Sequence, residues 1–162
     1  MFVIFRAIVY ATLFIGFLLI YLPARVLETA GIVRPSQIAA LEIAGIIAGS
    51  IGAALALWCI STFATIGKGT PAPFDPPRRL VIRGPYRFVR NPMYIGAALA
   101  LAGAALCYKS ASLLAYAVAF LLLCHLFVLA YEEPTLRRIF GADYEAYCRR
   151  VSRWWPAARA AP

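Results

Sequence analysis

Residues 92–131 read PMYIGAALALAGAALCYKSASLLAYAVAFLLLCHLFVLAY, and this stretch decides the fold. It contains two apolar segments, Pro92–Cys107 and Ser112–Tyr131, separated by a short polar turn around Lys109 and Ser110. An α-helix rises about 1.5 Å per residue, so a segment of about 20 apolar residues crosses the hydrocarbon core of a bilayer. The stretch therefore predicts a tight antiparallel hairpin of membrane helices.

The rest of the chain continues this pattern. Of the 162 residues, 63% are hydrophobic and 14% are charged, whereas a soluble domain has about 25% charged residues. Two further apolar segments, Phe2–Leu22 and Ile38–Ile66, precede the hairpin, and the second is rich in Gly and Ala, which let membrane helices approach closely. The prediction is an all-α polytopic membrane protein with about four transmembrane helices, a C-terminal helical hairpin and short amphipathic cytosolic helices.

The net charge of +9 indicates how the protein is oriented. Most cations follow the second and fourth apolar segments: Lys68, Arg78, Arg79, Arg83, Arg87 and Arg90, then Arg137, Arg138, Arg149, Arg150, Arg153 and Arg159. The other two connections carry Arg25, Arg34 and Lys109. Lys and Arg are retained in cytoplasmic loops, so we expect an integral protein of a bacterial inner membrane with both termini and its site in the cytoplasm. Basic residues placed beside apolar segments do not favour nucleic acid as a partner.

Metal binding is not expected either. The four cysteines, Cys59, Cys107, Cys124 and Cys148, contain no CxxC pair, and three of them lie inside apolar segments. A structural zinc site needs clustered thiolates or imidazoles, which the single His125 does not complete.

Two polar motifs remain, and both are expected on the cytoplasmic side. The first is RGPYRFVRNPMY at residues 83–94, in which Asn91 and Pro92 suit the N-cap and first position of a helix. Such a helix start also presents backbone N–H groups to an anion. The second is the pair Glu132 and Glu133, which opposes the dipole of the helix that it ends, and Pro134 is expected to break that helix. The pair is either a solvated surface pair held by arginines or a carboxylate aimed at a cation or a ribose hydroxyl.

Other polar and aromatic residues have two interpretations each. His125 lies two helical turns before Glu132 and either has an interhelical partner or contacts substrate. A set of tyrosines forms either an aromatic wall or an ordinary interface belt: Tyr86, Tyr94, Tyr144 and Tyr147. Gly141 is a plausible helix stop, so the tail predicts two short amphipathic helices lying as a lid over the cytosolic end.

Taken together, these motifs resemble the isoprenylcysteine carboxyl methyltransferase and phospholipid methyltransferase superfamily of membrane enzymes over about residues 66–156. The matching pieces, in order, are Gly84-Pro85-Tyr86, Arg90-Asn91-Pro92-Met93-Tyr94-Ile95-Gly96, Glu132-Glu133, Leu136, Phe140-Gly141, Tyr144, Tyr147, Val151-Ser152-Arg153 and Pro156. Residues 1–65 would then be an N-terminal transmembrane helix pair, and residues 66–162 a methyltransferase-like core of loop, hairpin and lid, within one domain. No nucleotide-binding, hydrolase or metalloprotease motif competes with this interpretation.

The resemblance implies S-adenosylmethionine as the cofactor, in a cytosol-open pocket capped by the C-terminal segment. Carried over by position, it implies cofactor contacts from Arg78, Arg79, Leu80, Val81, Tyr86, Arg90, Asn91, Pro92, Met93, Tyr94 and Glu132. Many relatives have His where this chain has Asn91, which excludes an imidazole base at that position. The prenylcysteine enzymes have a substrate-binding arginine where this chain has Val128, which favours a more hydrophobic or uncharged acceptor.

The predicted function is therefore methyl transfer from S-adenosylmethionine to a lipophilic small molecule or lipid head group. A thiolate or carboxylate acceptor needs no base, whereas an amine must arrive neutral, and Glu133 or His125 is the candidate catalytic residue for that step. Two alternatives stay open: a membrane reductase related to the sterol reductases that uses NADPH, and a non-catalytic membrane scaffold.

Overall fold

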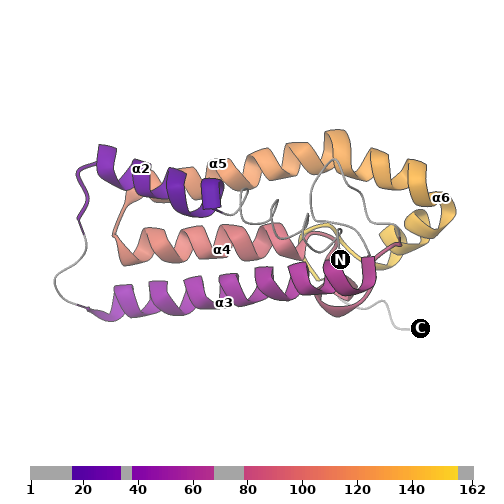
Figure 1. Ribbon diagram of the computed structural model, residues 1–162, viewed down its shortest axis with the longest axis horizontal. Coiled ribbons are helices and arrows are strands. Elements are labelled where there is room, and N and C mark those ends of the chain that lie inside the picture. Colours follow the sequence, from indigo (N-terminus) through magenta and orange to yellow (C-terminus); the bar gives the residue numbers. More distant parts are fainter. Residues whose placement is uncertain (1–15, 34–37, 68–78, 157–162) are drawn as a thin grey trace.

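The computed structural model describes residues 16–33, 38–67 and 79–156, and these residues form a helical bundle (Figure 1). The elements in chain order are η1 (Gly16–Tyr21), α2 (Leu22–Thr29), α3 (Ala40–Thr62), η2 (Phe63–Gly67), η3 (Gly84–Arg87), α4 (Pro92–Cys107), α5 (Ala111–Phe127), η4 (Val128–Glu132) and α6 (Glu133–Arg150). Between the described residues the only β-type pairing is an isolated parallel bridge that joins Val89 to Ser152. The predicted all-α class is confirmed. Residues 68–78, which include four prolines, and residues 1–15, which include most of the first apolar segment, lie outside the described residues.

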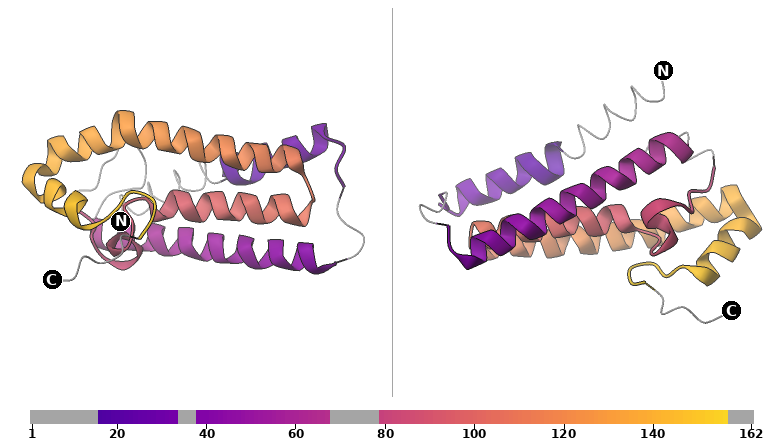
Figure 2. Two further views of the ribbon diagram at one scale, coloured as in Figure 1. Left: turned by 180° about the vertical axis from the view of Figure 1, so that it is seen from behind. Right: turned by 90° about the horizontal axis from the view of Figure 1, so that it is seen from below.

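Three described helices have the character of membrane segments. Ala40–Gly67 and Ala111–Arg150 are long and apolar enough to cross a bilayer, and Pro92–Cys107 is a shorter apolar helix between them. Figure 1 and Figure 2 show α4 lying between α3 and α5, with α2 beside the first turns of α5. A membrane protein with a helical hairpin is thus confirmed, and a total of four spans stays a prediction.

Glycines make the contact between α3 and α4 a contact of backbone on backbone. A Cβ atom built on Gly52 would lie 2.5 Å from the Ala100 nitrogen and 2.5 Å from the Gly96 oxygen. A Cβ on Gly45 would lie 2.6 Å from the Gly103 oxygen. No side chain fits at Gly45 or Gly52, in keeping with the Gly and Ala content of the second apolar segment. The helix that begins at Pro92 is therefore fixed on α3 along its length.

The α4–α5 hairpin closes as the sequence predicts. The turn contains Lys109 with φ of 48°, and the Ser110 side chain caps α5 by accepting a hydrogen bond from the Leu113 N–H at 3.0 Å. Lys109 also forms an ion pair of 2.6 Å with the buried Glu42 of α3, which ties this end of the hairpin to α3. The hairpin core contains Ala97, Leu101, Ala117, Phe120 and Cys124.

Two predicted helix ends are wrong. The first segment does not stop at Leu22, because the helix continues as α2 to Thr29, where Arg25 and Glu28 form an exposed ion pair. Hydropathy falls at that point although the helix does not end. The fourth segment does not end at Tyr131 either: it runs through Pro134 into α6, and Glu133 is helical with φ of −62° and ψ of −44°. The wide π turn η4 comes directly before Pro134, so the proline ring meets a widened turn and does not break the helix.

The predicted break at Gly141 is confirmed. Gly141 has φ of 48° and ψ of −121° inside α6, a conformation in which glycine avoids the steric cost of a side chain. The chain reverses there, and the second half of α6 returns toward the ends of α3 and α4 (Figure 1). The C-terminal segment, residues 151–156, thereby reaches the start of α4.

Candidate functional site

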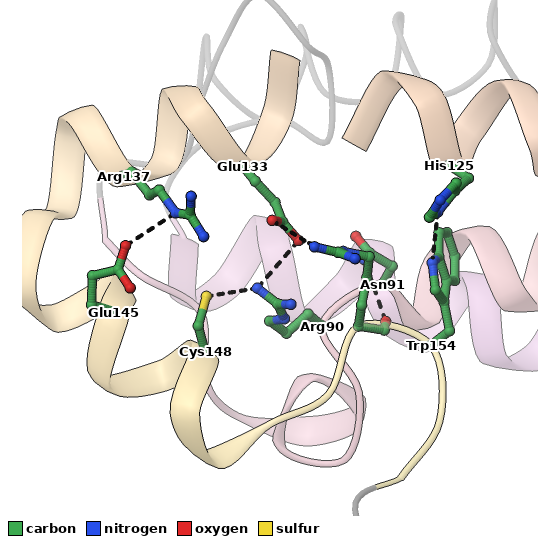
Figure 3. Close-up of polar contacts among 9 residues, drawn as sticks. Arg90, Asn91, His125, Glu133, Arg137, Glu145, Cys148 and Trp154 are labelled. Carbon is green, nitrogen blue, oxygen red and sulfur yellow. Dashed lines mark hydrogen bonds and ion pairs between the residues drawn. The ribbon is translucent and has the colours of Figure 1, made fainter. Parts of the chain in front are cut away.

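Four of the predicted site residues lie where the start of α4, the η4–α6 junction and the segment after α6 meet: Arg90, Asn91, Glu133 and His125 (Figure 3). The centre of this region is the carboxylate of Glu133, which is 5% exposed. Arg153 donates two hydrogen bonds to it, from Nε to Oε1 at 2.6 Å and from Nη2 to Oε2 at 3.0 Å. Nη1 of Arg90 lies 3.2 Å from the same Oε1. A buried acid is thus held between two guanidinium groups, which is the arrangement that compensates its desolvation.

Electrostatics keep this acid ionised. Burial alone would raise the pKa of the Glu133 carboxyl, but the hydrogen bonds from Arg153 and the positive charge of Arg90 outweigh that effect and hold the pKa below its usual range. Arg90 also donates to the Cys148 sulfur of α6. Glu133 therefore serves here as an ionised partner that joins α4, α6 and the C-terminal segment.

Backbone pairing strengthens the same junction. The Arg90 N–H donates to the Ser152 oxygen at 2.9 Å, and the Asn91 N–H donates to the Arg153 oxygen at 3.3 Å. Asn91 lies at the N-cap position of α4, as predicted, but its side chain does not cap the helix. Its Nδ2 donates to the Arg153 oxygen at 3.3 Å instead. The predicted capping role of this side chain is therefore wrong, because the passing C-terminal segment offers it an acceptor.

This geometry gives Asn91 a testable signature. Asp is as good an N-cap as Asn, but an ionised Asp side chain donates no hydrogen bond. We expect Asn91→Asp and Asn91→Ala both to lower the free energy of unfolding by about 1 kcal/mol or more, since each loses the bond to the Arg153 oxygen. Unfolding in nanodiscs measures this. An Asn91→Asp protein as stable as the parent would restore the capping role.

A second side-chain pair links the C-terminal segment to α5. The indole Nε1 of Trp154 donates to Nδ1 of His125 at 3.0 Å, and the two rings are 5.8 Å apart (Figure 3). A neutral imidazole that accepts at Nδ1 carries its proton on Nε2. In this arrangement the neutral His125 ring is a hydrogen-bond donor at its other nitrogen.

Glu132 has a different environment from its neighbour. The Tyr94 hydroxyl of α4 donates to its Oε2 at 3.0 Å. The ion pairs between described residues include Glu133 but not Glu132. One acid of the pair is thus neutralised by two arginines, whereas the other has a hydroxyl and no cation from the described part of the chain.

The π turn η4 decides which acid takes which place. The buried residues along this helix are Leu113, Ala117, Phe120, Cys124, Val128 and Glu133. The Glu133 N–H bonds to the Val128 oxygen, five residues back, as a π turn requires. A regular α-helix would place Glu132 on the buried stripe after Val128. The π turn contains one residue more than an α-helical turn, so Glu133 and not Glu132 follows Val128 on the buried face of the helix. Glu132 is left beside Tyr94.

The apolar part of the site lies next to these groups. Val81 and Tyr86 are buried in one cluster with Cys59 of α3, and Met93 packs against it. The Tyr147 hydroxyl donates to the Tyr86 oxygen at 2.6 Å, which holds η3 against α6. Leu80 belongs to another cluster, with Tyr144, Tyr147 and Val151. Leu80, Tyr147 and Val151 of that cluster also line a cavity of about 340 Å³.

The predicted site residues are therefore not all in one place. Tyr94 and Glu132 are hydrogen-bonded to each other. The C-terminal segment is held by Arg90, Asn91 and Glu133. Pro92 is buried at the start of α4. Arg79 is exposed, and Arg78 lies outside the described residues. The four tyrosines predicted to form a wall lie in two places. Tyr147 contacts both Tyr86 and Tyr144, whereas Tyr94 donates a hydrogen bond to Glu132.

Sequence reasoning missed the partners that complete these contacts. Arg153 and Trp154 are the counter-ion of Glu133 and the donor to His125, respectively. One signal was available: a buried acid needs a cation, and Arg153 belongs to a motif of the resemblance. No local sequence pattern predicts the contact between Trp154 and His125, because it depends on the direction that the chain takes after the reversal at Gly141. Among the residues that the structure describes, no group of His, Cys, Asp and Glu could hold a metal ion.

Comparison with known proteins gives the family of the chain. A sequence model of the phospholipid methyltransferase family matches residues 41–143, which include α3, both polar motifs and the hairpin between them. No curated protein and no solved structure matches the chain. The match extends over more than half of the 162 residues, so the chain belongs to the phospholipid methyltransferase family.

Proposed function

We propose that this membrane methyltransferase uses S-adenosylmethionine and methylates a lipophilic small molecule or a lipid head group. The observation that carries the proposal is the contrast between the two adjacent acids. Glu133 is neutralised by Arg90 and Arg153, whereas Glu132 has only the Tyr94 hydroxyl among its described partners. A carboxylate held in place without a cation is suited to bind one.

The described residues offer a partner for each part of this cofactor. Glu132 would accept hydrogen bonds from its ammonium group. The first-turn N–H groups of α4 are not capped by the Asn91 side chain and would receive its carboxylate. The Val81–Tyr86 cluster supplies an apolar and aromatic surface for adenine. When bound, S-adenosylmethionine supplies an electrophilic methyl group on a positively charged sulfur.

The protein's own residues then position and desolvate the reactants. Tyr94 orients Glu132 through their hydrogen bond. A carboxylate directly at the sulfur would stabilise the charge that disappears during transfer, so Glu132 is assigned to the amino-acid or ribose end. Glu133 is assigned to positioning the C-terminal segment through its bonds from Arg153, and proton acceptance from an amine by Glu133 or His125 stays a prediction. With the positive-inside orientation, the site faces the cytoplasm.

Titration with a matched pair of acids tests the proposal. S-adenosylmethionine, S-adenosylhomocysteine and NADPH are titrated into the protein in lipid nanodiscs, with Glu132→Gln and the control Glu28→Gln alongside. Glu28 is an exposed acid of α2, and α2 lies at the opposite end of the bundle from α6 (Figure 1). Gln keeps the shape of Glu132 and its bond from Tyr94 but loses the charge, so we expect at least about tenfold weaker binding of the first two ligands, the size of a lost charge-assisted hydrogen bond.

The alternatives have their own outcomes in the same titration. Preference for NADPH would support the reductase. Binding of none of the three ligands by folded protein would support a non-catalytic scaffold. Equal affinity in Glu132→Gln and Glu28→Gln would remove Glu132 from the cofactor site. A methyl-transfer assay with lipid extracts and labelled S-adenosylmethionine then identifies the acceptor.

A further inference from the structure

In the contact between His125 and Trp154, only one of the two ring nitrogens of His125 is used. His125 is the only histidine in the chain and the one strongly polar side chain in the last two turns of α5. Trp154 donates to its Nδ1, so the proton of the neutral ring is on Nε2. Hydrogen bonds between described residues do not include Nε2. This nitrogen is a donor that has no acceptor among them.

The position of His125 brings this donor to the lipid. Leu122, Leu126 and Leu129 are exposed on the outer surface of the helix, and His125 is three residues after the first and four before the last. Residues at these spacings share one helical face. His125 itself is half-buried and lies about two turns from Glu132 along the helix. The donor therefore lies at the edge of a lipid-facing surface, close to the level where the polar site begins.

A bilayer constrains the chemistry of the missing partner. An N–H group left unpaired in the apolar region costs several kcal/mol, so it is paired in the membrane with protein, water or lipid. A donor pairs with an oxygen, and at this level of a membrane the abundant oxygens are those of phosphate and ester groups. We propose that the Nε2–H of His125 binds a phosphate oxygen of a lipid head group, and that Trp154 is the positioning residue that fixes the required tautomer.

This inference rests on the proposed function in one respect: a lipid acceptor would approach Glu132 along this face of α5. The lipid bound at His125 is either the acceptor or a bulk phospholipid. Both present the same phosphodiester oxygens, so the experiment separates them by head group. The readout is not activity, so its failure is distinct from a failure of methyl transfer.

The single histidine makes the experiment direct. Tag-free protein labelled with ¹⁵N-histidine gives the signals of one imidazole in nanodiscs. We expect an unprotonated, hydrogen-bonded Nδ1, a protonated Nε2, and magnetisation transfer between the Nε2 proton and lipid phosphorus. Trp154→Phe keeps a large ring but removes the donor, and it is expected to yield a mixture of tautomers. The control Trp155→Phe changes an 80% exposed neighbour and is expected to leave the spectrum unchanged.

Two lipid compositions identify the source of the oxygen. Phosphorus contact in nanodiscs of phosphatidylcholine, whose nitrogen accepts no further methyl group, assigns the site to phospholipid in general. Contact only after phosphatidylethanolamine is added assigns it to a head group with a free amine. An unprotonated Nε2, a spectrum insensitive to Trp154→Phe, or no phosphorus contact in either lipid would overturn the proposal.

Discussion

Replacing Gly52 with Ala is expected to prevent α3 and α4 from packing. The added methyl group would lie 2.5 Å from two backbone atoms of α4, and backbone atoms in a helix cannot turn aside as a flexible side chain does. Overpacking a core costs about 1–3 kcal/mol where side chains can adjust. We expect a loss beyond the upper end of that range, because the two helices must separate. Unfolding of the purified protein in nanodiscs or mild detergent measures it.

Gly49 supplies the matched control on the same helix. A Cβ built there lies 3.8 Å from the Ala100 oxygen, which is an ordinary contact. Gly49→Ala is therefore expected to be neutral, or to stabilise the protein through the higher helix propensity of Ala. Equal stability of the Gly52→Ala and Gly49→Ala proteins would mean that the seam is looser than described. It would also mean that the start of α4 is not fixed by α3.

The Glu133→Gln substitution is expected to have the second large effect. Gln preserves the shape of the side chain but removes the charge that Arg90 and Arg153 share, and an uncompensated buried charge costs about 3–5 kcal/mol. The C-terminal segment should be held less firmly on α4, because the bonds between Arg153 and the charged Glu133 carboxylate are lost. Free energies of unfolding and the rate of proteolysis after residue 150 report the two effects.

The surface pair of Arg137 and Glu145 provides the comparison. These side chains are 52% and 48% exposed, so Glu145→Gln should change stability by less than about 1 kcal/mol.

Lowering the pH should destabilise the protein in the same way as Glu133→Gln, because protonation also removes the charge of the Glu133 carboxylate. Because the pKa of Glu133 is lowered on folding, its pairing stabilises the protein at neutral pH, and that stabilisation is lost as the pH falls through the folded pKa. A Glu133→Gln protein with parental stability and an intact C-terminal segment would contradict this role.

The parts of the fold that the sequence predicts well depend on local patterns. Pro92 and Cys107 are the bounds of α4 in both the prediction and the structure, and Gly141 marks a real reversal. The errors occur where contacts distant in sequence, or a change of helix type, override a local rule. Pro134 was expected to break a helix that a π turn carries through, and Asn91 was expected to cap a helix whose N-cap side chain bonds to Arg153.

The site shows the same division. Glu132 and Tyr94 belong to motifs that the sequence displays, but their hydrogen bond depends on how the hairpin aligns two helices. Glu132 and Glu133 are adjacent residues of the same type, so the sequence does not tell their roles apart. The additional residue in the π turn η4 places Glu133 among arginines and Glu132 beside Tyr94. Arg153 and Trp154 could not be assigned partners, since these depend on the course of the chain after Gly141.

The bridge between Val89 and Ser152 also bears on how the protein is made. The segment that completes the site follows the last apolar helix, so it is synthesised after the helices that cross the bilayer. Until Arg153 and Trp154 have been added to the chain, Glu133 lacks one of its two guanidinium partners and His125 has no indole beside it. The contacts of the C-terminal segment are thus the last part of the site that can form during synthesis of the chain.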